Sequence, residues 1–253
     1  MSRAIVTGAS GGLGLEFAKL LAKDGADLVL VARSGDKLER LASELRAAHG
    51  TKVETIAQDL GVFDAVARIT GRVRECDVLI NNAGFANRGK FDEIAPEATR
   101  EELLLDVVTL TELTRAYLPG MRAARSGRIL NVASTAGFLP GPYGAVYYAA
   151  KAYVISFSQA IAEELRGSGV TVTCLCPGAT DTGFADRANM RNTLLFRMPR
   201  ADAPSVALAG YRAMLAGHDL CVPGLRNQLT GVFAKFAPRR MLLRVSARLI
   251  APR

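Results

Sequence analysis

Two residues near the middle of the chain have the types and the spacing that proton transfer requires. Tyr147 and Lys151 lie four positions apart in a segment with a helical pattern, so both side chains project from one face. A free tyrosine has a pKa near ~10, which is too high for easy proton exchange at neutral pH. We expect the Lys151 ammonium to lower the pKa of Tyr147, which then serves as a general acid or base. The adjacent Tyr148 lacks this spacing.

Ser134 is predicted to complete a catalytic group with this pair. It ends an apolar run that precedes Tyr147, and its hydroxyl can hydrogen-bond a substrate oxygen as charge develops there. A Tyr-xxx-Lys spacing also recurs by chance in helices, so the prediction depends on all three residues together with a glycine-rich turn near the amino terminus.

The glycine-rich turn fits a dinucleotide phosphate. The first apolar run leads into Thr7–Gly14, which reads TGASGGLG, and a helical pattern follows at once. Glycines at such positions allow a tight turn, a close approach to pyrophosphate and close helix–sheet packing, while the helix N-terminus faces the phosphates. The alternative is a purely structural turn. The residues expected to bind cofactor here are Gly8, Ser10, Gly11, Gly12, Leu13 and Gly14.

The residue that follows the second apolar run favours NADP(H) over NAD(H). An Asp or Glu at the end of that strand would bind the ribose hydroxyls of NAD, but this sequence has Ala32 and then Arg33. A guanidinium pairs with a 2′-phosphate through two hydrogen bonds, whereas a carboxylate repels it. Arg33 is therefore predicted to select NADP(H); the alternative is a solvated loop residue.

Strands and helices alternate along most of the chain. Strands are predicted at Ala4–Thr7, Asp27–Ala32, Lys52–Ala57, Asp77–Asn81, Arg128–Ala133, Val170–Cys176 and Leu220–Val222. Helices are predicted at Gly12–Lys23, Asp36–His49, Val62–Arg74, Glu97–Ala124, Ala145–Ser168 and Asp202–Ala216. Strands that are apolar on both faces indicate a buried parallel sheet, and strict alternation predicts a doubly wound α/β fold with helices on both sides. We expect one domain over residues 1–224 and a basic amphipathic extension over residues 225–253.

Several motifs in this order resemble the short-chain dehydrogenase/reductase family, from Ala4 to about Gly224. Besides the turn, they are Asp59, Asn81-Asn82-Ala83-Gly84, Ser134, Tyr147-xxx-Lys151 and Pro177-Gly178-xxx-Thr182. The segments Ala32–Ser34 and Arg128–Ala136 look most like an NADP-preferring, bacterial-type oxidoreductase branch. The resemblance implies a Rossmann-like fold and an enzyme that interconverts a carbonyl and an alcohol by hydride transfer.

The resemblance also implies roles for individual residues. Asp59 would contact the adenine, Lys151 the nicotinamide ribose, and the segment after the sixth strand the nicotinamide. The implied cofactor contacts beyond the turn and Arg33 are Asp59, Leu60, Asn82, Ala83, Gly84, Tyr147, Lys151, Pro177, Gly178, Thr180 and Thr182. A structural alternative for Asn81–Gly84 is a polar cap on a strand end.

One position departs from the family pattern. The family usually has an Asn in the middle of the helix before the fifth strand, where it helps to hold a water linked to the Lys, and this sequence has Asp106. An ionised carboxylate only accepts hydrogen bonds. Asp106, counted with the catalytic group, therefore puts the efficiency of the proton relay in question and leaves the reaction class in place.

Substrate-binding residues are expected after Thr182. Gly183–Ala203 mixes apolar side chains with arginines, which fits a mobile lid with an apolar inner face and a small apolar carbonyl or alcohol substrate. The arginines can instead meet an acidic group or form a solvated face. The apolar surface of the long helices, and the family resemblance, predict a homodimer or homotetramer.

Charge is concentrated in the tail. The chain carries a net charge of +8, and residues 225–253 hold seven basic and no acidic residues. Such a segment can lie on an anionic membrane surface or pack on its own domain. Nucleic-acid binding is not expected, because the cations lie in one tail without a recognition motif. Four cysteines without a CxxC pair, and two histidines, predict no metal site and free thiols.

The sequence predicts a cytoplasmic protein with possible peripheral membrane contact, since it has no leader pattern and no apolar run of ~18 residues. Two alternatives to a general carbonyl reductase stay open. One is a membrane-surface lipid or ketoacyl reductase, and the other is an NADP(H)-binding sensor without turnover.

Overall fold

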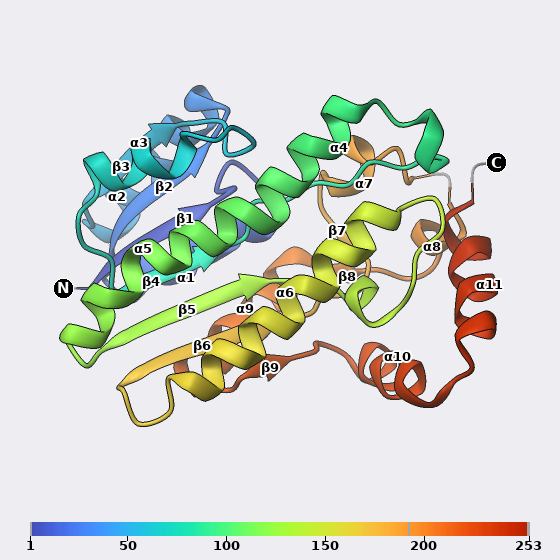
Figure 1. The fold of residues 1–253 in the computed structure, drawn as a ribbon. Coiled ribbons are helices and arrows are strands. Elements are labelled where there is room, and N and C mark those ends of the chain that lie inside the picture. The colour runs from blue at the N-terminus through green and yellow to red at the C-terminus, as the bar shows by residue number, and fades with distance from the viewer. Residues whose placement is uncertain (1, 192, 252–253) are drawn as a thin grey trace.

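A seven-stranded parallel sheet forms the centre of the computed structural model, which describes residues 2–191 and 193–251 (Figure 1). Its strands lie in the order β3-β2-β1-β4-β5-β6-β9. Their bounds are Arg3–Thr7 (β1), Asp27–Ala32 (β2), Val53–Ala57 (β3), Val78–Asn81 (β4), Gly127–Val132 (β5), Val170–Leu175 (β6) and Leu220–Cys221 (β9). The doubly wound, Rossmann-like α/β fold expected from the sequence is confirmed.

Helices cover both faces of the sheet. The bounds are Gly12–Lys23 (α1), Gly35–His49 (α2), Ala65–Arg72 (α3), Pro96–Leu103 (α4), Leu110–Ala123 (α5), Ala145–Glu164 (α6), Phe184–Arg187 (α7), Leu194–Arg197 (α8), Ala203–Leu215 (α9), Leu225–Phe236 (α10) and Arg239–Ile250 (α11). Two short strands, Thr180–Asp181 (β7) and Ala201–Asp202 (β8), pair beside the main sheet. In the described part of the chain, no helix has the length and apolar character to cross a bilayer.

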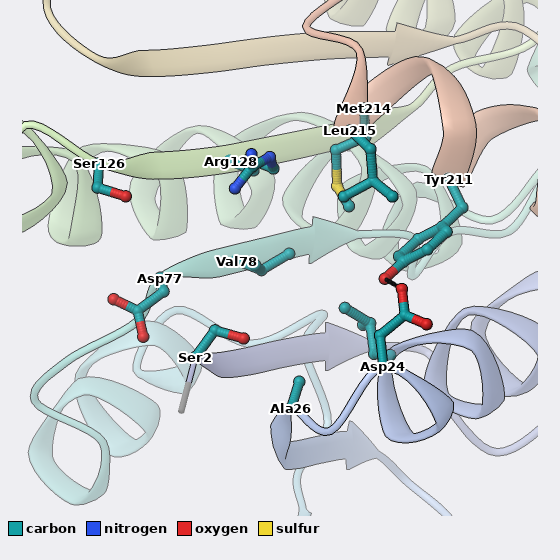
Figure 2. Close-up of a pocket in the computed structure, with 11 residues that line it drawn as sticks. Ser2, Asp24, Ala26, Asp77, Val78, Ser126, Arg128, Tyr211, Met214 and Leu215 are labelled. Atoms are coloured by element: carbon teal, nitrogen blue, oxygen red, sulfur yellow. Dashed lines mark hydrogen bonds between the residues drawn. The ribbon is translucent and has the colours of Figure 1, made fainter.

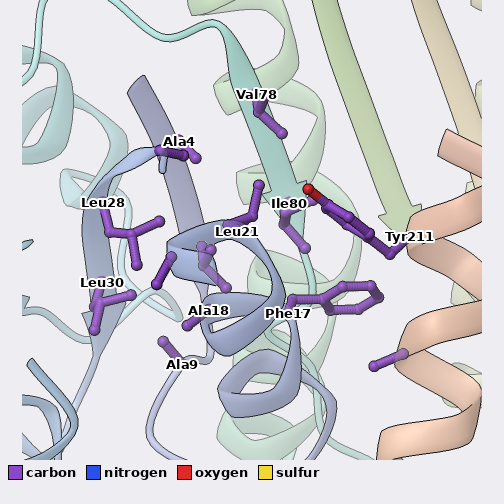
Figure 3. Close-up of a cluster of buried hydrophobic side chains, with 14 of the residues drawn as sticks. Ala4, Ala9, Phe17, Ala18, Leu21, Leu28, Leu30, Val78, Ile80 and Tyr211 are labelled. Atoms are coloured by element: carbon purple, nitrogen blue, oxygen red, sulfur yellow. The ribbon is translucent and has the colours of Figure 1, made fainter. Parts of the chain in front are cut away.

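Strand residues alternate between two apolar cores. In β1, Ala4 and Val6 join the core under α1, α2 and α9, while Ile5 joins the core under α3, α5 and α6. All three side chains are fully buried, because helices lie on both sides. Figure 3 shows the first core, with Phe17 of α1 pointing toward the helix that carries Tyr211. Burial on both faces fixes the register of each strand and hence the positions of its carboxyl end.

The predicted long helix over Glu97–Ala124 is interrupted. A π-helical turn, Leu104–Thr109 (η2), separates α4 from α5, and it carries Asp106. The buried residues of this turn are held from outside: the Thr109 hydroxyl donates to the Leu60 carbonyl oxygen at 2.7 Å, and Asp106 accepts from the Phe85 backbone N–H at 3.2 Å. A sequence period of 3.6 gives no sign of these tertiary contacts. Two other predicted helices, Val62–Arg74 and Ala145–Ser168, are shorter than expected at their ends.

The basic extension forms two helices that pack on the domain. Gly231 of α10 faces Phe138 in the 3₁₀ turn Thr135–Phe138 (η3), and Ile250 of α11 lies close to Gly144 at the start of α6. The buried positions of α11 recur every four residues, at Leu242, Ser246 and Ile250. Both helices therefore lie near the carboxyl ends of β5 and β6 (Figure 1).

Candidate active site

The glycine-rich turn lies where the sheet order reverses. β1 is flanked by β2 on one side and β4 on the other, so connections leave this point in opposite directions. Gly8 has φ +67° and Gly12 has φ +56°, a left-handed conformation that side chains rarely adopt. A Cβ on Gly14 would collide with the carbonyl oxygen of Gly8, so α1 packs against the strand end only without a side chain there. Ligands of open α/β sheets bind in the crevice at such a point.

Thr7 joins the two strands that form this crevice. Its hydroxyl donates to the Ile80 carbonyl oxygen at 3.1 Å and accepts the backbone N–H groups of Asn82 at 2.9 Å and Ala83 at 3.0 Å. The Asn82 amide donates to the Thr7 carbonyl oxygen at 2.8 Å. Asn82 and Ala83 thus brace the glycine turn. Thr7 was not among the sequence-predicted site residues, although a hydroxyl at a strand end just before a glycine turn was a usable signal.

The residues around the turn fit a dinucleotide. Helix α1 begins without a side-chain cap at Gly11, so its first N–H groups are directed at the space in front of the turn. A Cβ on Gly11 would meet nothing within 4 Å, which leaves that space open on one side. The side chain of Thr182 closes it on the other, 3.2 Å from where a Gly12 Cβ would lie. Half-buried Ser10 and Leu13 complete the turn.

One end of the crevice is formed by the residues that follow β2 and β3. Arg33 follows β2, is exposed, and forms no ion pair with the residues that the structure describes. Asp59 follows β3, and its carboxylate accepts the Gly61 backbone N–H at 2.9 Å. Leu60 is buried in the core with its neighbours from β3, so its side chain contributes to packing. Arg33 and Asp59 are therefore exposed polar groups at this end, which a ligand can reach.

The predicted catalytic residues come together at the carboxyl end of β5. Lys151 donates to the Val132 carbonyl oxygen at 3.3 Å, and its Nζ lies 5.5 Å from the centre of the Tyr147 ring. Ser134 follows β5, where its Oγ accepts the Ala136 backbone N–H at 3.1 Å. Tyr147 and Lys151 are both buried. The four-residue spacing thus places the phenol and the ammonium on the sheet side of α6.

The expected lowering of the Tyr147 pKa is wrong for this structure. Burial raises the pKa of Tyr147 above its ordinary value, the Asp106 carboxylate raises it further, and hydrogen bonding with Ser134 opposes both effects. Burial is the larger cause, and the Lys151 ammonium, which would oppose it, is already paired. Its Nζ lies 3.3 Å from Asp106 Oδ2, and both side chains are almost fully buried. A compensated ammonium does little to stabilise a phenolate.

Asp106 is positioned by backbone on two sides. Its Oδ1 accepts the Phe85 N–H, and Gly84 leaves the room that the pair needs, because a Cβ there would lie 2.8 Å from Asp106 Oδ1 and 3.2 Å from Lys151 Nζ. Burial raises the pKa of Asp106, while the Lys151 charge lowers it. Gly84 therefore leaves room for the Lys151–Asp106 pair at the edge of the crevice.

A second buried carboxylate, Glu102, lies beside this pair and was missed from the sequence. It is 1% exposed, and its Oε2 accepts the backbone N–H of Asn87 at 3.1 Å and the side-chain amide at 2.8 Å. Burial raises the pKa of Glu102 to about 7, against the lowering effect of Asn87. The available signal was its place four residues before Asp106, on the same face of a helix.

The segment after β6 forms the far wall. Pro177 accepts the Thr135 backbone N–H at 2.9 Å, and Thr180 donates to the Gly178 carbonyl oxygen at 3.0 Å. Gly178 packs against Asn227 of α10, where a Cβ would overlap the Asn227 amide. The ring of Phe184, two residues after Thr182, lies tilted against the Tyr147 ring, with 5.4 Å between their centroids. The loop thus brings an apolar ring to the Tyr147 phenol.

A pocket of about 410 Å³ lies at the opposite edge of the sheet, away from this site (Figure 2). Its residues come from the amino ends of the strands, such as Ser2, Asp77 and Arg128, and from α9, whose Tyr211 donates to Asp24 at 2.7 Å. Ligands in doubly wound sheets bind at the carboxyl ends. The described residues contain no group of three or more metal-ligating side chains.

Comparison with known proteins gives a consistent result. The family model described as short chain dehydrogenase matches residues 2–193. The very-long-chain 3-oxoacyl-CoA reductase of Rattus norvegicus is 35% identical over 208 residues, which cover 80% of this chain and 64% of that protein. This chain therefore spans less than two thirds of that relative's length.

Two solved structures share the fold and differ in cofactor. A short-chain dehydrogenase from Sphingobium yanoikuyae in complex with NADPH is 31% identical, with a TM-score of 0.82 and coverage of 92% of this chain and 93% of that one. A short-chain dehydrogenase/reductase from Burkholderia phymatum in complex with NAD is 25% identical, with a TM-score of 0.82 and 92% of each chain covered.

Replacing Glu102 by Gln is expected to flatten the pH dependence of stability. Folded Glu102 keeps its proton up to about pH 7, whereas an unfolded glutamate releases it near its ordinary pKa of 4.5. The folded state binds more protons in this window, so the free energy of unfolding falls as pH rises through it. Between pH 5 and 8, the free energy of unfolding of Glu102→Gln should fall on the order of 2–3 kcal/mol less than that of the wild type. Urea unfolding measures both.

The exposed neighbour Glu101 provides the matched control. Glu101→Gln is expected to leave the pH slope of the wild type in place. An equal slope in the wild type and Glu102→Gln would show that Glu102 stays ionised in the folded protein.

Proposed function

The chain belongs to the short-chain dehydrogenase family, and from this premise we propose that it interconverts a carbonyl and an alcohol by hydride transfer with NADP(H). The observation that carries the proposal is the convergence of Ser134, Tyr147 and Lys151 beside the glycine-rich turn. These residues supply a proton donor, a charge that orients it and an oxygen-binding hydroxyl within one crevice.

The protein supplies the proton and the position for this reaction. A bound nicotinamide provides or accepts the hydride. Tyr147 gives its phenolic proton to the carbonyl oxygen during reduction, and Ser134 donates a hydrogen bond to the same oxygen. The raised pKa of Tyr147 keeps the phenolic proton in place at neutral pH, so it is available for donation to a carbonyl oxygen. Lys151 holds the ribose side of the crevice while its charge is balanced by Asp106.

Arg33 supports NADP(H) as the cofactor. Its guanidinium is exposed at the end of β2 with no carboxylate paired to it among the described residues. The adjacent Ser34 is the residue before α2, so a phosphate held here also lies at a helix start. The NADPH complex of the Sphingobium protein agrees with this choice, and the NAD complex of the Burkholderia protein represents the alternative.

An apolar carbonyl compound is the proposed substrate class. The ring of Tyr147 belongs to a cluster of apolar side chains from the segment before α6, the loop after β6 and the tail. Its members include Ala188, Met190, Phe196, Leu139, Tyr143 and Leu249. The arginines of the loop after β6 are exposed. Arg191 pairs with Asp186, and Arg200 lies 3.5 Å from Asp181, so these cations have protein partners. The 3-oxoacyl substrate in the rat relative's name makes long-chain ketoacyl esters the first candidates.

A sensor that binds NADP(H) without turnover is the second candidate. The observation that favours it is the buried Lys151–Asp106 pair, which diverts the ammonium from Tyr147. The two functions separate in one assay, because a sensor binds NADPH tightly and consumes none of it.

We also propose that copies of this chain associate through α5 and α6. Tyr153 on α6 is exposed, stacks on Phe157 with ring centres 5.6 Å apart, and contacts Thr111 of α5 at 2.9 Å. Sedimentation at micromolar concentration should give a dimer or tetramer, and a monomer in both the wild type and Tyr153→Glu would contradict the assignment.

Tyr147→Phe is expected to abolish NADPH consumption while NADPH binding persists, because the ring stays and only the proton donor is lost. The measurement is NADPH absorbance against small aldehydes, steroids and long-chain ketoacyl esters, with Tyr148→Phe as control. A loss of about a thousandfold or more in kcat is the size that general acid catalysis implies. Turnover that survives in Tyr147→Phe would show that another group donates the proton.

Arg33→Ala is expected to raise the KM for NADPH by about tenfold or more, since a charge-assisted pair with the 2′-phosphate is lost. The KM for NADH should stay within about twofold, because NADH has no phosphate at that position. Steady-state kinetics with both cofactors measures this, with the exposed Arg40→Ala as control. An equal rise in the KM for NADPH and for NADH would show that Arg33 does not recognise the 2′-phosphate and has a structural role.

A further inference from the structure

Helix α10 turns its large apolar side chains toward solvent. Five of them are exposed, and they are Leu225, Leu229, Val232, Phe233 and Phe236. Phe236 is 83% exposed and Leu225 is 72% exposed. A surface helix of a globular domain normally buries such a stripe. The apolar face of α10 therefore needs another explanation than packing on its own domain.

The orientation of α10 is fixed by its opposite face, which is small and polar. Gly231 is buried against the Phe138 ring, where a Cβ would lie 3.3 Å from a ring carbon. Asn227 packs on Gly178, and its amide donates to the Pro223 carbonyl oxygen at 2.6 Å. At about 100° per residue these two positions share one side of the helix, and the apolar stripe lies on the other. Rolling the stripe inward would replace a glycine contact with bulky side chains.

Cations flank the stripe and continue beyond it. Arg226 and Lys235 lie on either side of it by helical angle, and Arg239 and Arg240 follow the helix. Arg244 and Arg248 continue the series on the exposed side of α11. No acidic residue follows Asp219, and these cations form no ion pair with the described residues. The tail thus presents the apolar stripe of α10 among basic residues that no acidic residue neutralises.

We propose that α10 is a docking surface for an anionic lipid bilayer, with the stripe inserted at the interface and the flanking cations at the headgroups. An interfacial helix has this arrangement of apolar ridge and basic flanks. A second copy docked face to face would bring two basic tails together with no acid between them, which is unfavourable. The charge therefore favours a membrane over a self-association surface.

The docked helix adjoins the active site. Phe138, which receives Gly231, ends the turn that begins after Ser134, and Gly178, which receives Asn227, follows β6. Ile250 of α11 reaches Gly144 beside Tyr148. Docking would place the crevice next to the acyl region of the bilayer, so that apolar substrates enter from the lipid. This last step rests on the proposed function, whereas the docking itself does not.

Vesicle flotation with the full chain tests the docking without any need for turnover. Phosphatidylcholine vesicles containing about a quarter phosphatidylglycerol should bind the protein at least about tenfold more tightly than phosphatidylcholine alone. The double variant Leu229→Glu/Phe236→Glu should lose about tenfold or more of that binding, because charged side chains replace the apolar ridge. Both positions are exposed, so the variant should unfold at the wild-type temperature.

Two matched control variants test whether binding depends on the position of the changed residues or only on the change in charge. Phe63→Glu/Phe91→Glu changes two exposed aromatic residues that are distant from α10 in the sequence, and it should bind like the wild type. Arg226→Gln/Lys235→Gln should weaken binding to the anionic vesicles alone, whereas Lys23→Gln/Arg74→Gln, at exposed positions of the domain, should not.

Sedimentation of the same variants decides whether a lipid bilayer or a second copy of the chain binds the apolar stripe. Binding that is lost only in the α10 variants supports the lipid surface. Wild-type binding that is absent, equal for both vesicle types or retained in Leu229→Glu/Phe236→Glu overturns it. A self-associated wild type that fails to bind vesicles and dissociates in that variant would assign the stripe to a second copy. Failure of turnover with intact vesicle binding would remove the proposed function and leave the docking in place.

Discussion

The arrangement of residues at the carboxyl ends of the strands depends on one constraint: the buried ammonium of Lys151 needs a compensating charge. Lys151 is 4% exposed, and an unpaired charge at that depth is strongly unfavourable. Asp106 supplies the charge at 3.3 Å and the Val132 carbonyl oxygen accepts a further hydrogen bond. The surrounding backbone adapts to this pair: η2 carries Asp106 in a π-helical turn, and Gly84 leaves room for both groups.

The same pair sets the protonation of the site. Burial raises the pKa of Tyr147 and the Asp106 carboxylate raises it further, so Tyr147 keeps its proton. Glu102 adds a second buried carboxyl group whose pKa is about 7, near enough to raise the pKa of Tyr147 as well. Two buried carboxyl groups beside one ammonium cannot both be charged without cost, and Glu102 keeps its proton because Lys151 pairs with Asp106. The arrangement holds protons at the catalytic edge, which suits a site that donates one to a carbonyl.

Segments from the first strand and from the tail line this edge. The glycine-rich turn after β1 forms one side of the crevice, braced by Thr7 and Asn82, and the tail helices cover the other side through Gly231 and Ile250. The contacts of α10 with the domain use Asn227 and Gly231, so its large apolar residues are left outside. Helix α10 therefore has one face against the crevice and an apolar, basic face toward the exterior. A surface that binds the outer face would lie next to the site.

Local sequence determined much of this protein. The alternation of apolar strands and helices predicted the doubly wound sheet, because both faces of a parallel sheet are buried and each strand is apolar throughout. The spacing from Tyr147 to Lys151 placed both on one helical face, since that geometry is set within a single turn. Tertiary structure decided what these residues meet. The pairing of Lys151 with Asp106, the burial of Glu102 and the π-helical turn depend on contacts between segments far apart in sequence. The direction of the Tyr147 pKa followed from those contacts, because burial and neighbouring charge, and not residue spacing, determine how strongly a proton is held.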